Sequence, residues 1–542
     1  MAKSKKEKNE LEPHKGKARD GAAGKRGIVT VPTQLPPAAL AAAAATAGMK
    51  RPRPATTRYP INLETFKSLK DEAEKIKVKA KRESTLIEDK GKKKTEKTVV
   101  PAPAAPSGEM APMAPAAVGN FAGLTSTGMI PSDCTLAAGP QHVLAAVNST
   151  FAIFRKTGGA ALFQQRLTAW FANVITNATI FDPKAIYDQH SGRWVLLAVA
   201  LPLDQSLNQS WFLISVSQTA DPMGGWWNFI YDATKDGTTA TNNWADYPCL
   251  GVDSQALYVT ANMFRFGGGF QYAKLRIFPK ANLYAGAATG FTDYVGLKNA
   301  DGSMAFTIQP CHTYGAPQVE YFVNSLYPSA TSSTKNTLSL WSLTNSLTAP
   351  SLTRRAVATD PYGMPPAAPQ KGGGAPLDSG DVRMLNAVFR GGSVWSALTS
   401  FYNWGDGVNV ASAQWFQINA TSGALVQQGI FGAPRRSYCY PVVMPDSNGN
   451  MTMLFARVGS SEFASIGYTG RAASDTAGRL QASSILRAGA ANYVSLDSIG
   501  LNRWGDYNGI SCDPADGRTI WLFSEFASAV NDWSTWIGSA RF

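Results

Sequence analysis

The chain has 542 residues, of which 51 are Lys or Arg and 38 are Asp or Glu, giving a formal net charge of +13. Residues 1–100 hold 25 basic and 12 acidic residues and carry the whole excess, while the remaining 442 residues hold 26 of each. A neutral body rich in Trp, Tyr, Phe and Gly is typical of β-structure with turn-rich connections and does not indicate a nucleic-acid-binding body.

Residues 1–118 are rich in Lys, Ala and Pro and nearly devoid of aromatic residues. Such a segment buries too little apolar surface to offset its ordering entropy, so we expect a disordered basic tail. A short helix near residues 63–87 is the exception, because Phe66, Leu69 and Ile76 recur there among Lys and Glu. The tail either binds an anionic polymer or membrane surface or serves as a solubilising linker.

The N-terminal region is highly charged and lacks the early apolar segment of a standard signal peptide. No apolar run approaches the roughly 18–20 residues of a membrane span. We therefore expect neither a signal peptide nor a transmembrane segment.

From Asn120 onward, short β-type runs alternate with Gly, Asn, Asp and Pro. Repeats of this texture start near Asp133, Asp182, Asp246, Gln309, Asp381, Tyr440 and Asp506. Successive starts lie about 50 to about 70 residues apart, which leaves room for four strands in each repeat. The pattern predicts an all-β fold, a seven-bladed β-propeller with four-stranded antiparallel blades, over residues 119–542.

The last repeat is too short for a complete blade. After Asp513 it has room for strands at Ile520–Phe523 and Trp533–Phe542, and then the chain stops. A missing outer strand would leave an unpaired sheet edge. We predict that the segment around Phe121–Met129 supplies this strand and so closes the ring.

The chain resembles a family of bacterial seven-bladed propeller proteins that are typically exported and mostly of unassigned activity. The matching pieces are Pro131-Ser132-Asp133, Phe181-Asp182-Pro183, Asp246-Tyr247-Pro248, Arg503-Trp504-Gly505-Asp506-Tyr507 and Trp536-Ile537-Gly538. The resemblance spans roughly residues 120–542. It implies the fold and an exported or cell-surface location, but not a function, and the basic tail departs from the family pattern.

The five cysteines, an odd number, do not indicate a disulfide framework. They are Cys134, Cys249, Cys311, Cys439 and Cys512. We expect small buried packing residues. A Cys249–Cys311 bridge or a thiolate metal site is the alternative.

The first strand of a propeller blade lines the central channel, so the aspartates that open the repeats should converge at one mouth. These residues are Asp133, Asp182, Asp246, Asp381 and Asp506. Carboxylates held close together repel unless a Ca²⁺-like cation or raised pKa values compensate. Metal candidates are Asp133, Asp182, Asp246 and Asp506. The favoured alternative is that each Asp accepts backbone hydrogen bonds and fixes a turn, and no cofactor is predicted.

A second set of aspartates lies at turns between first and second strands: Asp188, Asp253, Asp446 and Asp513. We interpret these four as structural, because an Asp side chain at a hairpin turn accepts hydrogen bonds from the turn's own backbone.

Several residue types at the predicted mouth suit the hydrolysis or elimination of a sugar. Catalytic candidates are Asp246, Tyr247, His312, Arg383, Asp506 and Tyr507. A carboxylate or Tyr could move the proton while Arg holds an acidic sugar. The sequence lacks a sialidase box, a His-Glu-x-x-His motif, a Gly-x-Ser-x-Gly elbow and a phosphate-binding loop. Four histidines argue against a His-based metal site.

Exposed aromatic residues would offer sugar-stacking platforms. The candidates are Trp226, Trp227, Trp404, Trp415, Trp533 and Trp536, although most propeller tryptophans pack between blades. The favoured hypothesis is a non-catalytic, monomeric binding or scaffold module that recognises a glycan or protein on a propeller face. The alternative is a carbohydrate-active hydrolase or lyase, so whether the chain is an enzyme stays open.

Overall fold

The structure is a computed structural model that describes residues 14–15, 25–30, 70, 114–329 and 332–542. Most of the predicted tail, including all of the helix expected near residues 63–87 except Lys70, lies outside the described residues. The described part is built almost entirely of strands, with short helical turns at α3 (Leu167–Trp170), η1 (Gln205–Leu207) and α4 (Lys280–Tyr284). None of its helices has the length and apolar character needed to cross a membrane.

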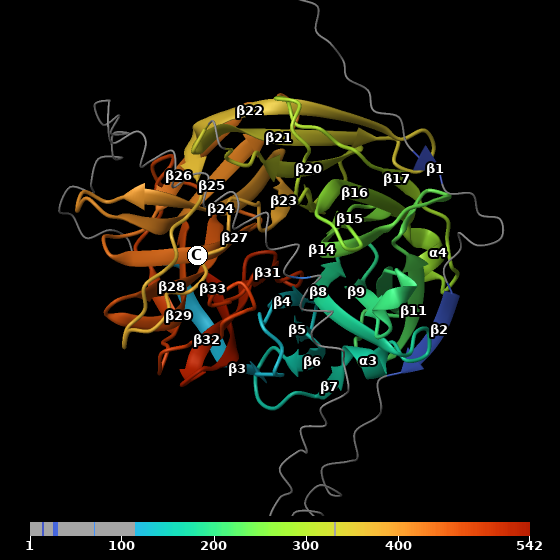
Figure 1. The fold of residues 1–542 in the computed structure, drawn as a ribbon, viewed down its shortest axis with the longest axis horizontal. Coiled ribbons are helices and arrows are strands. Elements are labelled where there is room, and N and C mark those ends of the chain that lie inside the picture. Colours follow the sequence, from blue (N-terminus) through green and yellow to red (C-terminus); the bar gives the residue numbers. More distant parts are fainter. Residues whose placement is uncertain (1–13, 16–24, 31–69, 71–113, 330–331) are drawn as a thin grey trace, which may run out of the picture.

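Antiparallel sheets are arranged around a common centre in chain order, which confirms the predicted β-propeller architecture (Figure 1). The first two sheets contain β4 (Thr135–Ala138), β5 (His142–Val147), β6 (Thr150–Arg155) and β7 (Phe163–Arg166), then β8 (Ala178–Asp188), β9 (Arg193–Pro202), β10 (Trp211–Ser217) and β11 (Gly225–Asp232). A small hairpin of β12 (Lys235–Asp236) and β13 (Thr239–Ala240) follows.

A large sheet and three smaller ones complete the ring. The large sheet contains β14 (Asn243–Val252), β15 (Ala256–Arg265), β16 (Phe270–Pro279), β17 (Thr292–Tyr294), β19 (His312–Thr313), β23 (Ala387–Arg390), β24 (Ser393–Asn403), β25 (Asn409–Asn419) and β26 (Leu425–Phe431). The smaller sheets contain β18 (Gln309–Pro310), β20 (Val319–Ser325), β21 (Thr334–Thr344) and β22 (Ser351–Gly363), then β27 (Arg436–Pro445), β28 (Met451–Gly459), β29 (Glu462–Arg471) and β30 (Ser484–Arg487), and finally β31 (Gly509–Cys512), β32 (Ile520–Ala529) and β33 (Asp532–Arg541) with β3 (Ala116–Thr125).

The predicted number of blades, seven separate four-stranded sheets, is not confirmed. The two-residue strand β19 pairs in parallel with both β14 and β23, through Val252↔His312 and His312↔Val388. These pairings join two runs of antiparallel strands into one ten-stranded sheet, which also includes β1 (His14–Lys15) at its edge. This bridge could not be predicted, because a run of two residues shows no strand periodicity.

The closure of the ring is as predicted. Strand β3 pairs antiparallel with β33 from Ala116↔Arg541 to Thr125↔Ser534, so a segment before the first repeat forms the outer strand of the last sheet. The hydroxyl of Thr535 fixes the seam, since it accepts from the Leu124 amide at 2.7 Å and donates to the Leu124 carbonyl at 2.8 Å. The strand begins a few residues earlier than the predicted Phe121–Met129.

Two short segments of the predicted tail form strands. Strand β2 (Lys25–Thr30) pairs with β11 over six residues, from Gly225↔Thr30 to Ile230↔Lys25. Strand β1 (His14–Lys15) pairs with β17. Both lie at the outer edges of their sheets (Figure 1), where they supply backbone partners to strands that would otherwise have an unpaired edge.

The core lies between neighbouring sheets, so inner strands are buried on both faces. Strand β9 is buried at every position after Arg193. Seven tryptophans are fully buried: Trp170, Trp194, Trp226, Trp244, Trp341, Trp415 and Trp533. The expectation that tryptophans mostly pack between sheets is confirmed for Trp226, Trp415 and Trp533, while Trp227, Trp404 and Trp536 are partly exposed.

All five cysteines are buried in the described part of the chain, and no disulfide joins them there. The alternative of a Cys249–Cys311 bridge is therefore wrong. Cys249 lies in β14 and Cys311 lies between β18 and β19. Burial raises the pKa values of both thiols, so they act as small apolar packing groups.

Candidate acidic site at the channel mouth

A repeated backbone feature places polar side chains at the hub. Asp133, Asp182, Tyr247 and Tyr440 have left-handed φ angles of 52°, 49°, 50° and 54°. In β8, β14 and β27 the pairing register shifts across this residue and the next, which is a β-bulge. A bulge bends the inner strand and turns its side chain toward the centre. The repeated signal in the sequence therefore marks a left-handed bulge at the entrance of the inner strand.

The aspartates do not occupy equivalent positions. Phe181 is the last paired residue before the bulge in β8, and Asp246 is the last in β14, so Asp182 corresponds to Tyr247 rather than to Asp246. The carboxylates of Asp182 and Asp246 nevertheless contact the same Lys70 ammonium, because both residues lie within one position of the bulge. The prediction that they share a mouth holds, but the alignment on which it was based is one residue out of step.

Lys70, from the predicted tail, supplies a cation at this mouth. Its ammonium lies 2.5 Å from Oδ1 of Asp246 and 3.2 Å from Oδ2 of Asp182. It also lies 5.1 Å from the centre of the Phe181 ring. Burial alone would lower the pKa of this ammonium, but Asp182, Asp246 and Asp133 outweigh burial and hold the pKa above its usual value. Lys70 is therefore charged at any physiological pH.

Asp133 completes the acidic group with an oxygen that lacks a partner. The Asn148 amide donates to Oδ2 of Asp133 and accepts from the Asp182 amide, which ties the two bulges together. Oδ1 of Asp133 has no hydrogen-bond partner among the described residues, and the side chain is 1% exposed. Burial raises the pKa of this carboxyl well above its usual value, and the charges of Asp506 and Asp182 raise it further. A raised pKa means that Asp133 takes up a proton at a higher pH than an ordinary aspartate does.

Two other predicted residues are held in local ion pairs. Asp506 accepts from the Arg503 guanidinium at 2.9 Å. Asp381 accepts from Arg383 through Nε and Nη2, with the shorter contact at 2.6 Å. The Arg383 guanidinium also covers the Tyr247 ring at 4.2 Å. Both arginines are therefore committed to contacts within the protein, and neither is left to hold a sugar carboxylate.

The two predicted tyrosines cross the hub and bond to backbone carbonyls. Tyr247 donates its hydroxyl to the Asp506 carbonyl at 3.1 Å, and Tyr507 donates to the Pro183 carbonyl at 3.0 Å. Their rings meet edge to face, with centres 5.6 Å apart. Burial raises the pKa of both phenols well above the usual value. They are neutral hydrogen-bond donors that join opposite inner strands.

Lys184 lies next to these rings. Its ammonium is 2.8 Å from the centre of the Tyr507 ring and 5.3 Å from that of Tyr247, and it makes no hydrogen bond or ion pair with the described residues. Burial lowers its pKa to about 8, although Cys249 and the acidic group raise it. Part of the residue remains exposed into the channel.

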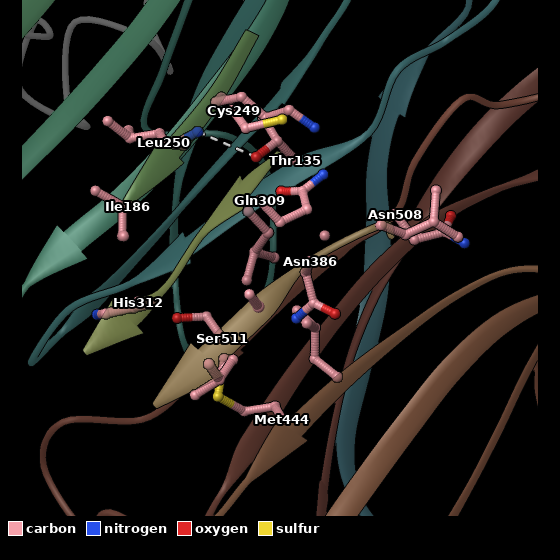
Figure 2. A pocket seen from close by; sticks show the side chains of 18 of the residues that line it. Thr135, Ile186, Cys249, Leu250, Gln309, His312, Asn386, Met444, Asn508 and Ser511 are labelled. Carbon is pink, nitrogen blue, oxygen red and sulfur yellow. Dashed lines mark hydrogen bonds between the residues drawn. The ribbon is translucent and has the colours of Figure 1, made fainter. Parts of the chain in front are cut away.

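Beyond the tyrosines the inner strands enclose a cavity of about 90 Å³. Figure 2 shows side chains that line this cavity from several parts of the chain, among them Cys249, Gln309, Asn386 and Asn508. Its volume is well below the roughly 300–1,000 Å³ of ordinary ligand pockets. This part of the channel has room for a few water molecules only.

His312 lies away from the acidic mouth, at the other end of this cavity. Its Nε2 is 2.7 Å from Oε1 of Gln189, and its ring stacks on Tyr314 with centres 4.5 Å apart. Burial lowers its pKa to about 3, despite the opposing charge of Asp188. The prediction that His312 joins Tyr247 at one place is therefore wrong, because β19 leaves the inner-strand position to bridge β14 and β23.

The second set of aspartates is structural, as predicted. Asp253 accepts from the amides of Gln255 and Ala256, and Asp446 accepts from those of Asn448 and Asn450. Asp188 and Asp513 accept in the same way from their own turns. Each carboxylate replaces a backbone carbonyl in holding a hairpin.

A larger cavity of about 300 Å³ lies where the hairpins of β23–β24 and β27–β28 meet. Its wall includes Arg390, Trp395, Gln417, Gln427 and Arg471. Amide and guanidinium groups such as those of Gln417, Gln427 and Arg390 are suited to hydrogen bonds with sugar hydroxyls. No residue of this pocket was a sequence candidate, because its members come from separate repeats with no shared motif.

Sequence reasoning also missed Lys70, Lys184 and Glu525. Lys70 is one of many lysines in the predicted tail, and Lys184 follows the conspicuous Asp182-Pro183 pair. Glu525 is buried in β32, where hydrogen bonds from Ser132 and the Gly505 amide only partly offset the effect of burial, which raises its pKa to about 8. Only the repeated X-Pro step at 182–183, 247–248 and 440–441 could have marked the bulges.

The fold and hub define the class of protein, a β-propeller with an acidic channel mouth. No protein-family model matches the chain, and no curated protein matches it significantly by sequence. The bacterial family suggested by the sequence motifs is therefore not confirmed.

Solved structures resemble the chain only at the level of the fold. A protein of unknown function from Dyadobacter fermentans is 12% identical, with a TM-score of 0.39, 66% of this chain and 94% of that chain covered. An α-L-arabinanase from Penicillium chrysogenum is 11% identical, with a TM-score of 0.36 and coverages of 79% and 99%. The Dos1 propeller is also 11% identical, with a TM-score of 0.36 and coverages of 78% and 94%. These likenesses carry no argument about function.

Proposed function

We propose that this protein is a non-catalytic binding or scaffold module that recognises a glycan or protein partner on a propeller face. The observation that carries the proposal is that the hydroxyls of Tyr247 and Tyr507 donate hydrogen bonds to backbone carbonyls across the hub. A catalytic acid or base needs a proton-transfer group directed at substrate. In the mouth, the two tyrosines, Arg383 and Asp506 are all held by intramolecular partners instead.

The cavity at the hairpin end favours a glycan as partner. At about 300 Å³ it reaches the size of ordinary ligand pockets, and Trp395, Gln417 and Arg471 line it. Gln417, Gln427 and Arg390 supply the amide and guanidinium groups that would bind the hydroxyls of the glycan.

We also propose that the protein is a monomeric propeller and that its basic segment 1–118 is an arm that binds an anionic polymer or membrane surface. Charge supports this role, because residues 1–100 carry the whole net charge of +13.

We further propose that the ring has seven blades, with β14–β17 and β23–β26 as two of them. Each run, taken without β19 and β1, has four antiparallel strands, and each of the other sheets of the ring also has four when β2 is set aside. A crystal structure in which the ten-stranded sheet forms one continuous blade would contradict this count.

The second candidate function is a carbohydrate-active hydrolase or lyase. It is favoured by Asp133, a carboxyl with a raised pKa and an unpartnered oxygen beside other carboxylates. An acid held protonated next to an ionised carboxylate is the arrangement that many glycosidases use.

A combined screen of glycan binding and polysaccharide turnover separates the two functions. The variants are Asp246→Asn/Asp506→Asn and, as control, Asp221→Asn, whose side chain is 62% exposed. Binding without turnover, unchanged in both variants, is the expected result. Turnover by the wild-type protein that the double variant loses and the control keeps would establish the enzyme.

A further inference from the structure

We infer that the acidic mouth formed by Asp133, Asp182 and Asp246 is a binding site for a primary alkylammonium group, and that Lys70 is its intramolecular occupant. This inference deepens the proposed binding function and rests on it, because it names the chemical group that the propeller mouth would recognise on a partner. Two molecules can supply the ammonium group that fills this site: the protein itself, through the Lys70 side chain, or an external primary amine.

The contacts of Lys70 match the donor geometry of an ammonium. An ammonium has three N–H donors and no acceptor. One donor meets Oδ1 of Asp246 at 2.5 Å, and the nitrogen lies 3.2 and 3.4 Å from the two oxygens of Asp182. The unpartnered Oδ1 of Asp133 belongs to the same charge cluster, since Asp133 raises the Lys70 pKa.

The site is built by the fold rather than by chance contact at the surface. Asp182 is held in a left-handed bulge, its amide bonded to Asn148 and its Oδ2 bonded to the Tyr247 amide at 3.0 Å. The side chains of Asp182 and Asp246 are 2% and 8% exposed, and that of Lys70 is 15% exposed. Three buried carboxylates thus lie at one mouth, Asp182 in β8, Asp246 in β14 and Asp133 just before β4. Hydrogen bonds from the Asn148 side chain and the Tyr247 amide hold Asp133 and Asp182 in place.

The surroundings favour an organic ammonium over a divalent metal ion. The ring of Phe181 lies 5.1 Å from the Lys70 nitrogen, within the range of a cation–π contact. Calcium takes roughly six to eight oxygen ligands. Among the described residues no three acidic, His or Cys side chains come together in a metal-ligand arrangement. The Ca²⁺ alternative raised by the sequence therefore becomes an outcome to be tested.

The test measures the binding of n-butylammonium chloride by calorimetry to three full-length proteins: wild type, Lys70→Ala and Lys156→Ala. Lys156 is the matched control, because it pairs with Asp513 at 2.7 Å with side-chain exposures of 16% and 9%. We expect Lys70→Ala to bind the amine at least about tenfold more tightly than the other two. Adding Asp246→Asn to Lys70→Ala should abolish the gain.

Calcium chloride and tetramethylammonium chloride at equal ionic strength are the comparison ligands. Equal amine affinity in all three proteins would overturn the inference, as would a Lys70→Ala protein that prefers Ca²⁺ or binds tetramethylammonium equally well. The outcome is independent of the polysaccharide screen. A gain in amine affinity together with turnover would refute only the non-catalytic function, whereas glycan binding without any amine gain would refute only this inference.

Discussion

Glu525 is the buried acid whose ionisation should be easiest to detect. Its side chain lies in β32 and is 2% exposed, and its pKa rises from 4.5 to about 8. A carboxyl whose folded pKa exceeds its unfolded value contributes stability below the unfolded pKa and loses it as pH rises through the folded pKa. The free energy of unfolding should therefore fall between about pH 4.5 and pH 8.

The Glu525→Gln variant tests this dependence by urea unfolding at pH 5 and pH 8.5. Since one pKa unit corresponds to about 1.4 kcal/mol, the wild type should lose on the order of 2–4 kcal/mol more than the variant over this range. Glu462→Gln, at a partly exposed ion pair with Arg457, serves as control and should follow the wild type. Parallel curves for wild type and Glu525→Gln would mean that Glu525 stays ionised throughout.

For single residues, the sequence predicted that aspartates gather at the hub, but it did not predict their register or their cationic partner. Asp133 and Asp182 occupy the left-handed position, which Asp adopts more readily than most residues. The register was not visible, since Tyr247 takes the bulge position that Asp182 takes in the neighbouring strand. Lys70 could not have been placed, because no local pattern distinguishes it from the other lysines of the N-terminal segment.

At the scale of strands, the seam between β3 and β33 is the feature that a single substitution tests best. Thr535→Val keeps the side-chain shape but leaves the buried amide and carbonyl of Leu124 without the hydroxyl. Buried polar groups without partners cost about 1–3 kcal/mol each, so we expect a loss of about 2–4 kcal/mol in the free energy of unfolding. Thr535→Ser retains the hydroxyl and should lose less than about half of that. Equal losses would show that packing, not hydrogen bonding, holds the seam.

Strand β2 makes a second prediction at this scale. Removing residues 1–30 takes away the partner of β11, so amides of segment 226–230 that face outward should exchange faster with deuterium. Strand β10 lies on the inner side of β11 and is the internal control. Unchanged exchange in segment 226–230 after the truncation would contradict the pairing.

The element scale also shows where sequence reasoning succeeds. The missing outer strand was predictable because a closed ring requires equal sheets and the last repeat was visibly short. Strands β1 and β19 were not predictable, since two residues are too short for an alternating pattern. Strand β2 was not predicted because it lies in a segment whose composition is typical of disorder. These short strands form where a strand distant in the sequence offers unpaired backbone groups.

At the scale of the whole molecule, opposite charges are separated along the chain and meet in the fold. The propeller body is neutral overall but concentrates Asp133, Asp182, Asp246 and Asp506 at its hub, while the N-terminal segment holds the basic excess. Lys70 connects the two at a distance of 2.5 Å from Asp246. The central feature of the hub is therefore the ion pairing of Lys70 with Asp182 in β8 and Asp246 in β14.

Carbodiimide coupling followed by peptide mass spectrometry tests that meeting directly, since the reagent joins a lysine amine to a contacting carboxylate with loss of one water. We predict linked peptides that join Lys70 to Asp246 or Asp182, alongside the equally exposed control pair Lys156 and Asp513. Coupling of Lys156 to Asp513, with Lys70 linked to neither Asp182 nor Asp246, would contradict the account.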